Sequence, residues 1–268
     1  MTGAPPRTLA PNVARAANLI RQSQMTVALT GAGISTPSGI PDFRSPGAGL
    51  WEEADPMEVA SIIGFRRNPQ SFYRWIRPLA RTMIGAQPNA AHLALAELEA
   101  GGRLAAVITQ NIDLLHSRAG SRQVLEIHGH IREATCLNCR GVQPAAPVFQ
   151  RFLEDGRTPH CPECGGVLKP NVVLFGEELP AALLIEAQRL ARQCDLMLVA
   201  GSSLEVAPAG DLPGLALAAG ARLIIVNREP TPYDAEAEVV IHADVAEALP
   251  AIVAELSAVA ARPEGAGG

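Results

Sequence analysis

The sequence predicts a parallel α/β fold, in which helices cover both faces of one sheet. Three observations lead to this prediction. Short unbroken apolar runs recur along the chain, segments with helical spacing separate them, and a glycine-rich loop follows the first run. The chain has 268 residues, of which 48% are hydrophobic, so it can bury a large core.

The apolar runs are typical of buried strands, because they are rich in β-branched residues and end in small or polar ones. In chain order they are 25–29, 104–109, 196–200, 223–227 and 239–243, and a further β-like run ends at Glu126. The segments with apolar residues three and four positions apart are 90–100, 180–193 and 246–261. Two stretches interrupt this rhythm and are candidate insertions: 45–88, rich in aromatics, Arg and Pro, and 132–169, rich in Cys, Gly and Pro.

Charge and hydropathy exclude several functional classes. A net charge of -5 and a pI near 5.7 argue against nucleic acid as the main ligand. No apolar run approaches the roughly 18 to 20 residues needed to cross a bilayer. Because the first residues also lack the apolar core of a signal peptide, we expect a cytoplasmic protein. We expect flexible ends at 1–11 and 259–268, which are rich in Pro, Gly and Ala.

The loop at 30–44, TGAGISTPSGIPDFR, follows the first strand and indicates a nucleotide site. Gly31 and Gly33 would let backbone N–H groups approach a diphosphate, although a tight turn would also use them. Thr36 stands where a dehydrogenase fingerprint has its third glycine, so that motif is not met. The tail at 41–44 combines an acid, an aromatic and a base, and this favours a ligand over a turn.

Polar residues follow two later strands. Gln110, Asn111 and Asp113 come after the second run, at the sheet edge where ligands of parallel sheets gather, although a helix N-cap would also explain an Asn or Asp. His128 follows the run that ends at Glu126. With a pKa near neutrality it suits a general base, but His128 or His130 could equally cap a strand.

Four cysteines in the second insertion predict a zinc site. They form two C-x-x-C turns, each followed closely by glycine: Cys136, Cys139, Cys161 and Cys164. Four thiolates match tetrahedral Zn²⁺ and leave no open position, so the ion would be structural. A disulfide is the weaker alternative in a reducing compartment.

Taken in order, these motifs resemble the sirtuins, which are NAD-dependent protein-lysine deacylases. The resemblance rests on GAGIS with PDFR, TQNID, the His-Gly pair, the two cysteine turns, KPNVVLFGE, GSSLEVAP and VNRE, and it covers roughly residues 12–255. It implies a Rossmann-like NAD-binding domain built from 12–44, 89–131 and 170–258. It also implies a helical insertion at 45–88 and a zinc-binding module at 132–169.

The resemblance implies a set of contacts to NAD. His128 would be the base, with Asn111 and Asp113 bordering the nicotinamide pocket. The full set of residues implied for NAD is Gly31, Ala32, Gly33, Ile34, Phe43, Arg44, Gln110, Asn111, Asp113, Gly201, Ser202, Ser203, Asn227, Arg228, Glu229, Asp244 and Val245.

The resemblance also implies an acylated-lysine protein or peptide as substrate, with nicotinamide and 2′-O-acyl-ADP-ribose as products. The channel for the acylated lysine would be formed by Val172, Val173, Leu174 and Phe175, and the substrate backbone would be flanked by Gly176, Glu177 and Val206. No metal ion would take part in the reaction.

The acyl preference depends on Tyr73. Family members that remove acidic acyl groups carry an Arg three positions after this Tyr, whereas here Ile76 occupies that place and Arg77 comes next. On a helix both offsets return to the same face, so Arg77 stays a candidate for an acidic acyl group, although acetyl or longer apolar groups are favoured. Protein ADP-ribosyl transfer and a non-catalytic NAD sensor are the alternatives, and the oligomeric state stays open.

Overall fold

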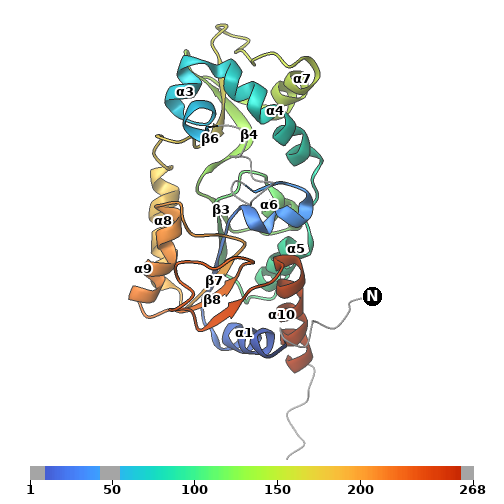
Figure 1. The fold of residues 1–268 in the computed structure, drawn as a ribbon, viewed down its shortest axis with the longest axis vertical. Helices are drawn as coiled ribbons and strands as arrows, with labels where there is room; N and C mark the ends of the chain where they lie inside the picture. Colours follow the sequence, from blue (N-terminus) through green and yellow to red (C-terminus); the bar gives the residue numbers. More distant parts are fainter. Residues whose placement is uncertain (1–9, 43–54, 261–268) are drawn as a thin grey trace, which may run out of the picture.

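A computed structural model describes residues 10–42 and 55–260 of the chain. Its larger sheet has six parallel strands in the order β3-β2-β1-β7-β8-β9 (Figure 1). The strands are β1 (Thr26–Thr30), β2 (Ala106–Thr109), β3 (Val124–Glu126), β7 (Leu196–Ala200), β8 (Arg222–Val226) and β9 (Val239–Ile241). The predicted parallel α/β fold is confirmed, and each strand begins and ends within two residues of its apolar run.

The strand order reverses at β1, which pairs with β2 on one side and with β7 on the other. Leu29, for example, lies beside Ile108 and Val199 in register. In an open parallel sheet, the loops that leave such a strand diverge to opposite faces and open a crevice at the carboxyl ends. The glycine-rich loop follows β1, so the sequence places it at that crevice.

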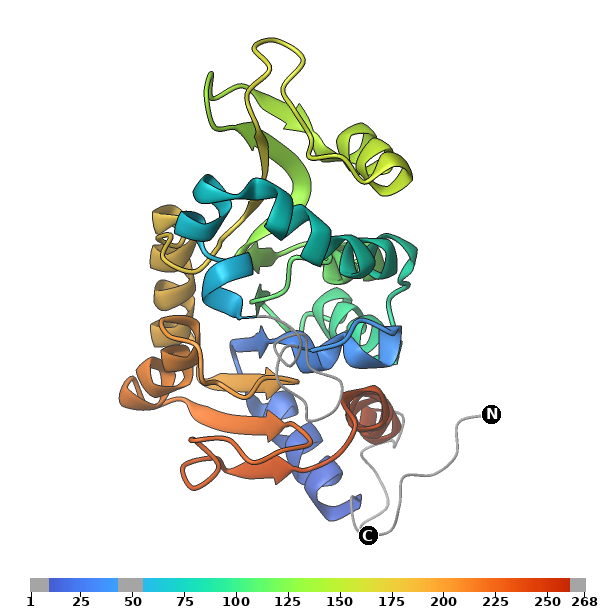
Figure 2. The ribbon, with the colours of Figure 1, turned by 45° about the horizontal axis from the view of Figure 1, so that its top comes forward.

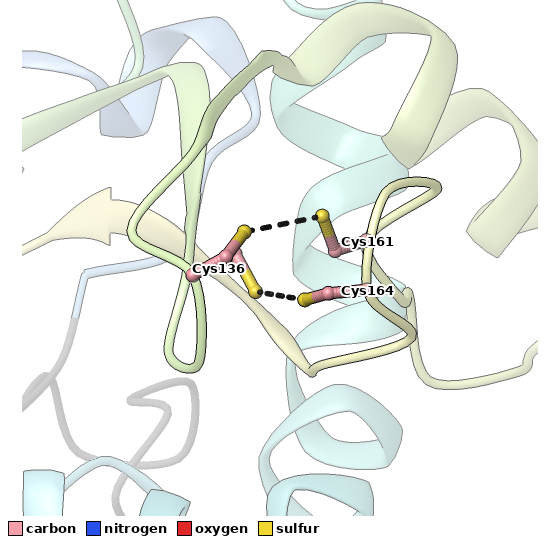
Figure 3. A group of neighbouring side chains, drawn as sticks. Cys136, Cys161 and Cys164 are labelled. Atoms are coloured by element: carbon pink, nitrogen blue, oxygen red, sulfur yellow. Dashed lines mark hydrogen bonds between the residues drawn. The ribbon is translucent and has the colours of Figure 1, made fainter.

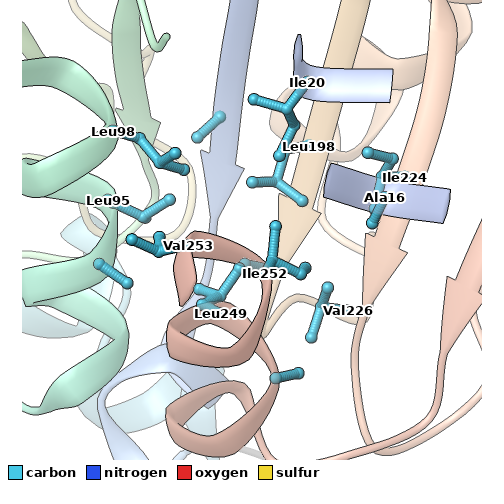
Figure 4. Packing of buried hydrophobic residues seen from close by; sticks show 14 of the residues in the cluster. Ala16, Ile20, Leu95, Leu98, Leu198, Ile224, Val226, Leu249, Ile252 and Val253 are labelled. Carbon is cyan, nitrogen blue, oxygen red and sulfur yellow. The ribbon is translucent and has the colours of Figure 1, made fainter. Parts of the chain in front are cut away.

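Successive residues of the strands enter two separate cores. Ala28, Leu198 and Ile224 pack against helices α1, α5 and α10 on one face, as Figure 4 shows for the last two. Leu29 and Val199, one position further along their strands, pack against α8 and α9 on the other face. Figure 2 shows α8 and α9 on one side of the strands and α10 on the other. Burial of both faces explains why the central residues of these strands are apolar.

The helices include the three that helical spacing predicts, at α5, α8 and α10. The α-helices are α1 (Ala10–Gln22), α2 (Pro56–Val59), α3 (Ile62–Arg67), α4 (Pro69–Gly85), α5 (Ala90–Ala100), α6 (Leu115–Ala119), α7 (Ala145–Asp155), α8 (Ala181–Gln193), α9 (Leu212–Ala218) and α10 (Val245–Ala260). Short 3-10 helices are η1 (Ala32–Ile34), η2 (Thr36–Ser38) and η3 (Ala209–Asp211). In the described residues, no helix has the length and apolar character to cross a membrane.

A second, antiparallel sheet holds the cysteine region. It has the order β5-β4-β6, with β4 (Gly129–Cys136), β5 (Val142–Pro144) and β6 (Leu168–Val172). Phe149 and Phe152 of α7 share an aromatic core with Phe65 and Phe72 of α3 and α4. These elements form the end of the molecule opposite α1 and α10 (Figure 1). Two residues, 127 and 128, join β3 of the first sheet to β4 of the second.

Candidate functional site

A cleft of about 1870 Å³ lies at the carboxyl ends of the parallel strands, between the two sheets. It collects loops that are far apart in the sequence. The predicted site residues that line it are Gly31, Ala32, Gly33, Gln110, Asn111, Asp113, His128, Val172, Val173, Leu174, Phe175, Gly176, Glu177, Gly201, Ser202, Ser203, Val206, Asn227, Arg228, Glu229, Asp244 and Val245. Phe43 and Arg44 lie outside the described residues. Ile34, Tyr73 and Arg77 are described but do not line the cleft.

The glycines of the first loop permit two loops to touch. A Cβ on Gly33 would lie 2.9 Å from the carbonyl oxygen of Gly201, and one on Gly201 would lie 2.2 Å from the Ile34 nitrogen. Gly31 and Gly33 also donate their N–H groups to the carbonyls of Ala200 and Gly201. These two N–H groups are therefore already used by neighbouring backbone, so a diphosphate at this loop would need other N–H donors. Ile34 points into the core of the sheet, where it is fully buried.

A polar network lies behind this loop. Ser35 donates to Asp113 across 2.6 Å, and the Asn111 side chain donates to Ser35 and to the Gly31 carbonyl. The loops after β1 and β2 are thus joined by Asn111 and Asp113, two of the three residues that the TQNID motif predicts for the site. Sequence reasoning did not single out Ser35, although it stands inside the quoted GAGIS motif.

Two buried histidines support the same loops. His116 contacts the Thr30 hydroxyl at 2.9 Å, and its ring packs edge-on against His92 with centroids 4.8 Å apart. Burial lowers the pKa of His116 to about 3, an effect that the neighbouring His92 strengthens. Burial also lowers the pKa of His92 to about 4, although the Asp113 charge opposes this shift. Both rings are therefore neutral near pH 7, and neither was predicted from the sequence.

His128 is held by its Nδ1 atom. That nitrogen lies 3.0 Å from the Gln110 carbonyl oxygen, which can only accept, so Nδ1 carries the hydrogen and Nε2 keeps its lone pair. Burial lowers the pKa of His128, and the hydrogen bond to Gln110 partly offsets that effect. The following residue must be glycine, because Gly129 has φ +80° and a Cβ there would lie 2.1 Å from the Asn171 carbonyl oxygen. The imidazole is therefore a neutral acceptor at the cleft.

The loops after β7 and β8 form the other half of the cleft. Ser202 accepts a hydrogen bond from the Gln110 side chain across 2.9 Å, which ties the loop after β7 to the loop after β2. Asn227 donates to the Glu229 carbonyl, and Arg228 forms an ion pair with Asp244. Gly201 also donates its N–H to the Val226 carbonyl, so the residues of the GSS and VNRE motifs lie together along one wall.

Tyr73 and Arg77 are turned away from the cleft. The Tyr73 hydroxyl donates to the Leu168 carbonyl at 2.5 Å, and its ring is buried among other aromatics. Arg77 donates to the carbonyls of Leu153 and Glu154 at the end of α7. Neither side chain lines the cleft in this structure, because the Tyr73 hydroxyl and one terminal nitrogen of Arg77 are bound to backbone carbonyls of the second sheet and of α7.

The four cysteines converge as the metal prediction requires. Their sulfur atoms all lie within 4.8 Å of one another, and Figure 3 shows Cys136, Cys161 and Cys164 facing a common centre. Cys136 and Cys164 are 3.5 Å apart at sulfur, and Cys139 and Cys161 are 3.7 Å apart. A tetrahedral Zn²⁺ with bonds of about 2.3 Å places its sulfur ligands about 3.8 Å apart. The geometry fits zinc, whereas a disulfide needs about 2.05 Å between sulfurs.

A family model and a curated relative each match most of this chain. A model of the Sir2 family matches residues 31–208. The NAD-dependent protein deacylase 2 of Archaeoglobus fulgidus is 48% identical over 248 residues, which cover 91% of this chain and 96% of the relative.

Two solved structures extend the similarity to the fold. One, from work on the mechanism and regulation of Sir2 enzymes, has a TM-score of 0.87 and 47% identity, and covers 93% of this chain and 99% of its own. The other, Sir2Af2 bound to a myristoylated histone peptide, has a TM-score of 0.82 and 42% identity, and covers 94% and 98%.

Proposed function

Because the chain belongs to the Sir2 family and is an NAD-dependent protein-lysine deacylase, we propose how the residues of its cleft divide the reaction. Its substrate is an acylated lysine in a protein or peptide. One observation carries the proposal: His128 reaches the cleft from the link between β3 and β4, and Asn111 and Asp113 reach the same cleft from the loop after β2. A general base and a polar pocket wall are the groups that the chemistry needs side by side.

His128 is the general base. When bound, NAD would supply the ribose carbon from which nicotinamide departs as the acyl oxygen attacks, and one water would be consumed as the free lysine is released and the acyl group is carried off on 2′-O-acyl-ADP-ribose. His128 Nε2 takes a proton from a ribose hydroxyl, and the hydrogen bond from Nδ1 to the Gln110 carbonyl stabilises the imidazolium that forms. Zinc supplies no chemistry here, because four thiolates fill its tetrahedral positions.

The two walls of the cleft hold the nucleotide. Ala32 is assigned to the diphosphate, and Ser202, in the loop that the glycines bring against it, is assigned to the adenosine half. Asn111 and Asp113 border the nicotinamide pocket. The adenosine half is assigned to the opposite wall, at Gly201, Ser203, Asn227, Arg228, Glu229, Asp244 and Val245. By the resemblance, Phe43 and Arg44 are assigned to close over the nicotinamide ribose.

The apolar segment 172–175 holds the acyl-lysine. Val173 donates its N–H to the His128 carbonyl at 2.8 Å, so this segment runs directly beside the catalytic residue. Gly176 and Val206 are assigned to the substrate backbone, which would add as a strand between the two loops. An acyl oxygen entering along this segment therefore arrives close to the imidazole.

One assay tests the proposal against its nearest rival, ADP-ribosyl transfer to protein. Zinc-loaded full-length protein is incubated with NAD and an acetyl-lysine peptide, and the products are identified by mass. We expect free lysine, nicotinamide and O-acetyl-ADP-ribose in equal amounts. Protein carrying ADP-ribose, with the acetyl group still on the peptide, would overturn the assignment in favour of transfer.

A preference for longer acyl groups is a second candidate. The cleft continues between α4 and α7 over a set of apolar side chains: Phe72, Trp75, Leu79, Met83, Phe149 and Leu153. An alkyl chain that reaches this surface gains about 0.8 kcal/mol for each CH₂ removed from water. A peptide panel from acetyl to myristoyl, with succinyl included, measures the preference through kcat/KM. A value that falls steadily with chain length would exclude this candidate.

A cytoplasmic location is also part of the proposal. Four thiolates that must stay reduced to hold zinc suit a reducing compartment. Fractionation of cells that express the protein, with detection of the intact chain, tests this location. Recovery in the membrane or secreted fraction would contradict it.

A further inference from the structure

Lys169 carries a charge in an almost buried position beside the cleft. It lies at the start of β6, and its side chain is 11% exposed. Its Nζ atom lies 2.7 Å from the Val172 carbonyl oxygen, 3.3 Å from that of Pro170 and 2.8 Å from the Glu177 carboxylate. An ammonium has three N–H donors, so all three are used within one short segment.

Glu177 completes the arrangement from the other end of the segment. The carboxylate oxygen that meets Lys169 also accepts the N–H of Leu174 at 2.9 Å. The pair therefore connects Lys169, before the acyl-lysine segment, with Glu177, after it. Lys169 binds the Val172 carbonyl, and Glu177 binds the Leu174 amide. The segment therefore forms a loop that the ion pair closes.

The loop so closed touches both the catalytic residue and the helical region. Val173 bonds to the His128 carbonyl, and Phe175 exchanges two backbone hydrogen bonds with Ala60 and Ile62. Those contacts lie on either side of Leu174, whose amide the ion pair holds. A change in the loop's register would therefore shift the apolar channel against the imidazole.

We propose that Lys169 and Glu177 are positioning residues that fix the acyl-lysine loop 172–177 in its binding conformation. The inference rests on the proposed function of this loop. Replacement of a buried ion pair by apolar or neutral residues is often harmless to stability, whereas removal of one partner leaves an uncompensated charge. We therefore expect this pair to determine the conformation of the loop more than the stability of the fold. An ion pair that only supports the fold would affect stability alone.

The experiment compares Lys169→Met, Glu177→Gln and the double variant in the zinc-loaded full chain. KM for an acetyl-lysine peptide, KM for NAD, kcat and Tm are measured. We expect each single variant to lose thermal stability and the double variant to regain most of it. The peptide KM of the double variant should stay raised by roughly 10- to 100-fold, because the loop has lost its geometry, while the KM for NAD stays unchanged.

The matched control is the exposed pair of Arg15 and Glu238, which lies in α1 and before β9. Arg15→Met with Glu238→Gln should leave all four quantities unchanged. A double Lys169/Glu177 variant with the wild-type peptide KM would overturn the inference while leaving the proposed function intact. Equal rises in KM for peptide and for NAD would also overturn it. Wild-type protein without deacylation would overturn the proposed function, and this inference with it.

Discussion

At the scale of single residues, the chemistry depends on which atoms the backbone already occupies. The Gln110 carbonyl fixes the Nδ1 hydrogen of His128 and so presents Nε2 as the acceptor. The carbonyls of Ala200 and Gly201 likewise use the amides of Gly31 and Gly33, so these glycines serve loop contact. In both cases a main-chain group decides what the site residue is able to do.

The base assignment predicts the effect of His128→Ala. We expect turnover to fall by roughly a hundred to ten thousand fold, because proton removal from the ribose hydroxyl is lost. Nicotinamide and O-acyl-ADP-ribose production measure it, with zinc content and Tm as checks of the fold. His130→Ala, which alters the neighbouring imidazole, is the control. Turnover near the wild-type rate in His128→Ala would remove the residue from its role.

Close loop contact predicts that Gly201→Ala is harmful. Gly201 has φ +62°, which disfavours alanine, and the added Cβ would lie 2.2 Å from the Ile34 nitrogen. We expect Tm to fall and the KM for NAD to rise, since the loops after β1 and β7 must separate. Gly85→Ala is the control, because a Cβ there meets nothing within 4 Å. Equal Tm values for the two variants would contradict this reading.

The sequence predicted most of the residues that line the cleft, but not the buried histidines that hold the loops of the cleft in place. Motifs next to strand ends located His128 and Asp113, because parallel strands bring their carboxyl ends to one edge. The contacts of His116 with Thr30 and of His92 with Ser35 could not be predicted in this way. They join residues 86 and 57 positions apart, and no local pattern marks either histidine.

At the scale of elements, the pattern of cysteines predicts the metal ligands but not the secondary structure around them. Two C-x-x-C turns predicted the metal site, but not the antiparallel sheet or α7 around it. The signal for α7 was present, since Ala145, Phe149 and Phe152 are buried at helical spacing. The density of Gly, Pro and Cys in the insertion obscured it. Arg77 and Arg81 of α4 both donate to the Leu153 carbonyl near the end of α7, which joins this region to the helical insertion.

Loss of the metal should therefore affect the structure and the turnover of the protein beyond the four cysteines. We expect Cys139→Ser to lose zinc and to unfold the second sheet first, because apparent zinc affinities in small modules correspond to roughly 10 to 16 kcal/mol. Turnover should fall as well, since Gly129 of β4 pairs with Val172 of β6 beside His128. Zinc content and hydrogen exchange over residues 129–172 measure this.

The control for the metal experiment is Cys194→Ser. Cys194 ends α8, is buried and contacts the Ala191 carbonyl, outside the cysteine cluster. This variant should keep its zinc and its exchange pattern. Retention of zinc and full turnover by Cys139→Ser would show that three thiolates suffice.

At the scale of the whole molecule, the fold class could be predicted because the apolar strand segments and the helical segments both suit a sheet that is buried on two faces. Doubly buried strands such as β1 and β7 are apolar at all their central positions, and the helices between them are long enough to cover both faces. The order β3-β2-β1-β7-β8-β9 was not predicted. Strand order depends on long-range pairing, such as Leu29 with Val199, which no single segment encodes.

The buried histidines predict an acid-sensitive fold. The pKa values of His92 and His116 in the folded state, about 4 and about 3, lie below the ordinary value of 6.5. The unfolded chain therefore binds more protons between pH 6.5 and these values, so stability is complete above pH 6.5 and is lost as the pH falls. Each ring contributes a slope of up to about 1.4 kcal/mol per pH unit.

Urea unfolding at a series of pH values from 7.5 to 5 measures this slope, with zinc content followed at each pH. His116→Phe keeps an aromatic ring that cannot titrate and should flatten the dependence of the unfolding free energy on pH. His160→Gln, at an exposed histidine near the cysteines, should leave it unaltered. If both variants keep the wild-type slope, the acid sensitivity arises elsewhere.

The connection between β3 and β4 has two residues, and the position of His128 depends on that number. His128 occupies half of that link, and the residues that flank the link, Glu126 and Gly129, already belong to different sheets. One inserted residue would turn the imidazole to the opposite side of the backbone, away from Gln110. The spacing between Glu126 and Gly129 is thus as much a part of the catalyst as the ring it carries.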